Sequence, residues 1–154
     1  MKTSETEFEF PVLGFPVSQD FFGFRDRRTL TTCGRFTIKE NLAIGTELVD
    51  ANFRRWVVRA VKKVGNARPW FIRPFTYWLL APQFWVDHDL ESLEPISLKE
   101  VKDRIRLSMQ IYPPEWSHED DLDTVIATDF ADLEAAGSIA EIYERFQPDT
   151  FEAY

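Results

Sequence analysis

The chain has 154 residues, of which 44% are hydrophobic and 15% aromatic, so it holds enough apolar material for a buried core and is not an intrinsically disordered protein. Its one cysteine, Cys33, excludes an intrachain disulfide. The acidic start of the chain lacks the basic and apolar regions of a signal peptide, so we expect none, and prolines and charges interrupt the longest apolar stretch, near residues 70–86. We therefore expect one cytoplasmic domain over residues 1–154, with no membrane segment.

Charge is divided unevenly along the chain. The formal net charge is −8, made up of +5 for residues 1–82 and −13 for residues 83–154. Two halves that attract each other would explain the division, and so would an acidic surface that faces a basic partner. A plain solvated acidic face is the third explanation.

Alternation of apolar and charged residues predicts strands in the first half. Phe8, Phe10 and Val12 alternate with glutamates, and residues 35–40 show the same period of two. Shorter candidates are residues 21–24 and 46–49. Asp50 opens a predicted turn, because Asp and Asn side chains bond their own backbone.

Residues 53–64 fit two structures. A helix would place six apolar residues on one face, with Asp50 and Gly65 as caps. We predict a strand, because the segment is rich in valine and follows a turn. Prolines cut the aromatic segment 69–86 into short extended pieces, and residues 90–95 are predicted to be an acidic connector.

Helical spacing and caps dominate the second half. Ser97 with Glu100, and Ser138 with Glu141, are predicted capping boxes, and Ser117 is a third predicted N-cap. The sequence therefore predicts an α+β fold: an antiparallel twisted sheet over residues 1–95 and about three helices over 96–148.

No pattern of a catalytic or metal site stands out. Asp87, His88 and Asp89 are neighbours, so in a strand they point to opposite faces and do not converge on a cation. His118 begins a run of carboxylates that a helix N-terminus explains. Cys33 lies in no nucleophile motif. We predict no enzyme, no catalytic residue, no metal site and no cofactor.

The basic, aromatic first half favours an alternative. Twelve arginines and lysines between residues 25 and 73 are interleaved with aromatic residues, a pattern that suits single-stranded nucleic acid or a small-molecule enzyme site. The overall acidity, with a pI of about 4.8, argues against nucleic acid. We therefore expect no nucleic-acid partner.

Residues 45–50 followed by Arg54-Arg55-Trp56-Val57-Val58-Arg59 resemble a hairpin of small bacterial proteins. In those proteins a capped helix like residues 97–109 follows, and then an acidic, Trp-containing segment like 114–121. Some of them look like immunity proteins, which neutralise a secreted toxin. The resemblance covers residues 45–135 and departs at Phe53, where a turn glycine is expected. It implies a toxin inhibitor that acts by protein–protein binding.

The acidic stretch 115–134 is the predicted partner-binding surface. Helix dipoles explain carboxylates in a first turn but not near a helix end, so attraction to a basic protein is the expected role. Trp116 is the predicted aromatic anchor, with a place in the core as its alternative. The predicted acidic face comprises Trp116, Glu119, Asp120, Asp123, Asp129, Asp132 and Glu134.

Overall fold

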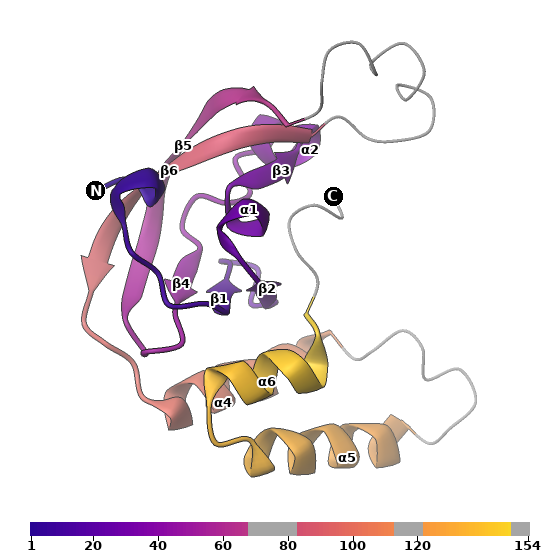
Figure 1. Cartoon of the computed structure of the whole chain (residues 1–154). Coiled ribbons are helices and arrows are strands. Elements are labelled where there is room, and N and C mark those ends of the chain that lie inside the picture. Colours follow the sequence, from indigo (N-terminus) through magenta and orange to yellow (C-terminus); the bar gives the residue numbers. More distant parts are fainter. Residues whose placement is uncertain (68–82, 113–121, 149–154) are drawn as a thin grey trace.

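A computed structural model describes residues 1–67, 83–112 and 122–148, the last range without the side chains of residues 122–125. Six strands form one antiparallel curled sheet, and the longest helices follow it in the chain (Figure 1). This confirms the predicted α+β fold. The elements are η1 Thr3–Glu5, β1 Val12–Phe15, β2 Phe22–Phe24, α1 Arg27–Leu30, β3 Thr32–Gly34, α2 Arg35–Lys39, β4 Glu47–Val49, β5 Arg55–Asn66, β6 Gln83–Leu93, α4 Leu98–Ile111, α5 Leu122–Ala135 and α6 Ile139–Phe146.

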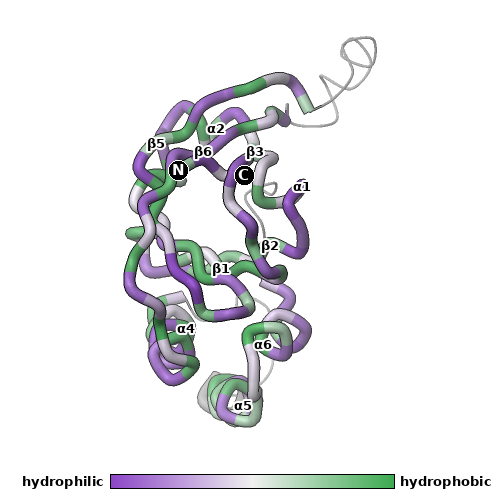
Figure 2. Tube along the Cα trace, turned by 60° about the vertical axis from the view of Figure 1, so that its left-hand side comes forward, coloured by the Kyte–Doolittle hydropathy of each residue, from purple (hydrophilic) through white to green (hydrophobic). Residues whose placement is uncertain are grey.

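The sheet has the strand order β2-β1-β4-β5-β6-β3. The short helix α1 connects β2 to β3, so it joins the two outer strands of the curl. Figure 2 shows α4, α5 and α6 gathered on one side of the sheet, next to β1. None of the helices that the structure describes is long and apolar enough to cross a membrane.

Two hydrophobic clusters lie on opposite faces of β1 and β4. Val12 and Leu48 belong to the cluster inside the curl, with Phe24 and Trp56. Their neighbours Leu13 and Val49 belong to the second cluster, which the helices cover. Successive side chains of a strand point to opposite faces, so these two strands are buried on both sides.

Burial on both faces explains why the first strand was predicted in the wrong place. Residues 8–11 of the alternating run lie outside the strands, and β1 is the continuous apolar run Val12–Phe15. A strand that is buried on both faces carries apolar residues on both and shows no alternation. The alternating pattern that predicted a strand therefore lies in the segment before β1.

Residues 35–40 are also a correction, because they form the short helix α2 and not a strand. Phe36 is exposed, and the neighbouring Thr37 is buried. Gly34 is the N-cap residue, and the helix ends after one turn. Alternation over only the six residues 35–40 is too short to separate one helical turn from a strand.

The predicted strand over residues 53–64 is confirmed as β5, which pairs with both β4 and β6. Phe53 adopts φ +62°, a left-handed conformation that glycine adopts most readily. This is the position where a turn glycine was expected. The predicted connector at residues 90–95 is wrong in part, because β6 runs through to Leu93.

One of the two predicted capping boxes is confirmed, and the other is confirmed only as an N-cap. Ser97 and Glu100 form a reciprocal capping box at the start of α4. Ser138 accepts a hydrogen bond from the backbone N–H of Glu141, but the Glu141 carboxylate accepts from the N–H of Gly137. Ser117 and Pro113–Pro114 lie outside the described residues, as does most of the aromatic segment 69–86.

Candidate functional site

The predicted acidic face falls partly on α5. Trp116, Glu119 and Asp120 lie outside the described residues, and Asp123 belongs to α5 without a described side chain. The last three residues of the prediction, Asp129, Asp132 and Glu134, are described in the C-terminal half of the helix.

Two of these three carboxylates have partners within the chain. Glu134 forms an ion pair with Arg106 of α4, and its backbone carbonyl accepts a hydrogen bond of 2.7 Å from the buried Lys102. Asp132 lies 3.5 Å from the guanidinium of Arg145 in α6. These pairs join α5 to both neighbouring helices, so Asp132 and Glu134 have a structural role in addition to any role in binding.

Asp129 differs from them, because it has no ion pair in the part of the chain that the structure describes. Partial burial raises the pKa of its carboxyl group, and the nearby Asp132 carboxylate raises that pKa further. Like charges three residues apart on a helix repel each other. Of the three described carboxylates of the acidic face, Asp129 is therefore the one whose charge is left without a cation among the described residues.

The histidine of the Asp87-His88-Asp89 triplet is enclosed. His88 is buried, and its Nδ1 lies 3.1 Å from the hydroxyl of Thr3 in η1. Burial lowers the pKa of His88 to about 4, against a smaller opposing effect of Asp87. The Asp87 carboxylate accepts hydrogen bonds from Ser4. His88 thus fixes the N-terminal segment against β6.

Cys33 is buried in β3 and belongs to the cluster inside the curl. Removal from water raises the pKa of its thiol to about 11, so very little thiolate is present at neutral pH. Among the described residues, no group of three His, Cys, Asp or Glu side chains is placed to hold a metal ion.

The basic strand β5 lies beside acidic residues of β6. Lys62 is the register partner of Asp87, and Ala60 that of Asp89. Arg59 pairs with Glu91 at 2.6 Å. The Arg59–Glu91 ion pair favours the interpretation that the two oppositely charged halves attract each other, and it reduces the positive field that a nucleic acid would meet.

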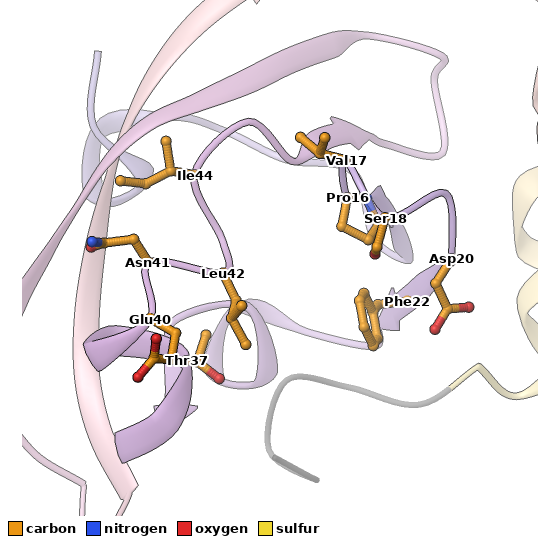
Figure 3. Close-up of a pocket in the computed structure, with 10 residues that line it drawn as sticks. All are labelled: Pro16, Val17, Ser18, Asp20, Phe22, Thr37, Glu40, Asn41, Leu42 and Ile44. Carbon is orange, nitrogen blue, oxygen red and sulfur yellow. The ribbon is translucent and has the colours of Figure 1, made fainter.

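A groove between two loops is a feature that the sequence did not reveal. One wall is the loop after β1 together with β2, and the other is the end of α2 with the loop that follows it (Figure 3). The first hollow of this groove has a volume of about 370 Å³. Its lining is Pro16, Val17, Ser18, Asp20, Phe22, Thr37, Glu40, Asn41, Leu42 and Ile44.

A second hollow of about 250 Å³ adjoins the first, and Val17 and Asp20 line both. Helix α4 adds Arg104 and Leu107 to it. The turns that frame the groove include Gln19 at φ +68° and Asn41 at φ +53°. The sequence shows that these loops carry apolar residues, but it does not show that the residues are exposed. Only the fold brings two loops some twenty residues apart to face each other.

A scan against models of protein families, a search of curated proteins and a search of solved structures each found no match.

Proposed function

We propose that this chain is a non-enzymatic binding protein that attaches to a basic protein through the acidic face, in the manner of an immunity protein that neutralises a toxin. The observation that carries the proposal is the carboxylate of Asp129. It is partly buried beside Asp132 and has no cation of its own among the described residues.

The position of Asp129 is unfavourable for the isolated chain. It lies in the middle of α5, Leu122–Ala135, too far from the N-terminal turn for the helix dipole to stabilise its charge. Arg145 and Arg106 are already engaged with Asp132 and Glu134. A lysine or arginine of a partner would offset the repulsion between Asp129 and Asp132. This contact would raise the affinity of the partner for the chain.

The rest of the molecule supports binding over chemistry. The two side chains with the most reactive potential in the described ranges, Cys33 and His88, are both buried and occupied in packing. The overall charge of −8 favours association with basic proteins. The resemblance of residues 45–135 to proteins of the toxin-immunity type points in the same direction.

The structure also sharpens the choice of variant. Neutralising Asp132 or Glu134 would break the ion pairs that join α5 to its neighbours, so a loss of binding would be ambiguous. Asp129→Asn removes a charge that has no ion pair with any described residue. Glu144→Gln is the matched control, because Glu144 is an exposed carboxylate on α6 with no ion pair among the described residues.

The first experiment identifies the partner. The immobilised wild-type chain, Asp129→Asn and Glu144→Gln are each incubated with an extract of the organism that encodes the chain, and the retained proteins are identified by mass spectrometry. We expect wild type and Glu144→Gln to retain the same basic protein, and Asp129→Asn to retain less of it. Retention of an acidic protein, or equal retention by all three, would contradict the proposal.

A further inference from the structure

We propose that the groove between the β1–β2 loop and the loop after α2 docks an extended segment of the basic partner. In this proposal an arginine or lysine side chain enters the first hollow and an apolar side chain enters the second. The inference rests on the proposed function and names the chemistry of the segment that the partner would present.

Apolar side chains stand exposed along the groove. Val17 is 77% exposed, Leu42 44% and Ile44 41%. They surround one concave region, and apolar residues gathered in this way mark binding surfaces more often than single exposed ones do. A partner segment would remove them from water.

The charge of the first hollow selects a cation. Asp20 and Glu40 lie on opposite walls, and no lysine or arginine is among the described residues of the lining (Figure 3). Oδ1 of Asp20 accepts hydrogen bonds from the Phe21 N–H at 2.7 Å and from the Ser108 hydroxyl at 3.4 Å. Its Oδ2 has no partner among the described residues, so it is available to a guanidinium or ammonium group.

The aliphatic stem of that cation would find apolar walls. Phe22 and Leu42 face the hollow from its two sides (Figure 3). Long basic side chains bury their methylene groups on such surfaces while the charged head stays near a carboxylate. At the same hollow, Thr37 is buried and its hydroxyl has no hydrogen-bond partner within the described ranges, a state that an entering polar group would relieve.

The second hollow suits an uncharged side chain. Phe15 and Leu107 give it apolar walls. Two of its charged lining residues, Glu47 and Arg104, already bind each other at 2.8 Å, and the third, Asp20, is shared with the first hollow. Since Val17 lies on the boundary of the two hollows, one extended peptide would fill both with side chains two residues apart, which point to the same side.

The test uses short capped peptides and the methyl signals of Val17, Leu42, Ile44 and Leu107 in NMR spectra of the full chain. The probes are acetyl-Leu-Ser-Arg-amide and the reversed acetyl-Arg-Ser-Leu-amide. The matched peptides replace arginine by glutamine or leucine by serine. We expect saturable shifts of the groove methyl groups with at least one probe order, and binding weaker by about fivefold or more with either matched peptide.

Variants of the chain complete the test. Asp20→Asn keeps the Oδ1 acceptor and Leu42→Ala shortens an exposed side chain, so both variants are expected to fold. We expect each of them to lower the affinity for the peptide about five- to tenfold. Glu144→Gln and Phe36→Ala are the matched controls, since Phe36 is exposed outside the groove lining. Neither control should change the peptide's affinity.

Absence of saturable shifts at the groove, or equal binding of the glutamine peptide, would overturn the groove proposal. Shifts confined to residues of α5 would overturn it too, and would leave the acidic face standing as the binding surface. A different outcome would contradict the proposed function alone. In that outcome the peptide binds in the groove, but Asp129→Asn retains as much partner as the wild type does.

Discussion

Oδ2 of the buried Asp50 carboxylate accepts a hydrogen bond of 2.8 Å from Nε of Arg54 and forms an ion pair with Nη2 of the same guanidinium at 2.7 Å. The same carboxylate accepts hydrogen bonds from the backbone N–H groups of Glu9, Asn52 and Arg54 at 3.0–3.2 Å. One side chain thus fixes the turn before β5 and the extended segment before β1. Charge-assisted bonds to a fully buried acid make this turn a rigid corner of the fold.

Removal of the guanidinium should therefore destabilise the protein. Arg54→Ala leaves the Asp50 carboxylate buried with only its backbone donors, and we expect the free energy of unfolding to fall by about 2–3 kcal/mol. This loss of stability is small for a broken buried ion pair, because the Arg54 side chain is 44% exposed. Urea titration measures it. Arg59→Ala, which breaks the exposed pair with Glu91, is the control and should change stability little; equal losses in both variants would contradict this role of Asp50.

His88 predicts a specific loss of stability in acid. Its pKa is about 4 in the folded chain, below the ordinary value of 6.5, because burial disfavours the charged ring. Between pH 6.5 and 4 the unfolded chain therefore binds a proton that the folded chain does not, and stability falls as the pH falls. The full effect is about 3 kcal/mol at most.

Urea titrations of wild type and His88→Gln at pH 7 and pH 5 measure this contribution. The wild type should lose more stability over this interval than the variant, because glutamine does not titrate. Parallel losses in the two proteins would show that other groups account for the acid sensitivity.

Gly23 in β2 lies against α6 so closely that no side chain fits. A Cβ atom there would come within 2.4 Å of Pro148 and 2.6 Å of the Tyr143 ring. We expect Gly23→Ala to cost about 1–3 kcal/mol of stability through overpacking. Gly65→Ala is the matched control in β5, where the nearest atom is 4.0 Å away, and should be nearly neutral. Thermal melts compare the two, and equal shifts of Tm would contradict the close contact.

The sequence predicted the fold where local signals agree with the tertiary structure. The caps at Ser97 and Ser138 and the helical stripes identified α4 and α6, because these helices bury one face only. The strand β5 was identified from its valines and the turn before it. The position of β1 was missed because Leu13 and Val12 enter different cores, which removes the alternation.

The candidate site was harder to predict for a different reason. The sequence singled out Asp132 and Glu134 as unexplained charges, and only the fold shows that Arg145 and Arg106 lie next to them. The groove depends on loops that share no local pattern. Contacts between distant segments decide both cases, and neither spacing nor composition encodes them.

The most direct measurement for the proposed function is the association rate of the purified partner at salt concentrations from about 50 to 500 mM, near and far from full screening of surface charge. Biolayer interferometry would compare wild type, Asp129→Asn and Glu144→Gln. The proposal predicts that association slows as salt rises, and that Asp129→Asn both lowers the rate at low salt and flattens its salt dependence relative to Glu144→Gln. An association rate that does not change with salt, or that is the same for Asp129→Asn and Glu144→Gln, would contradict it.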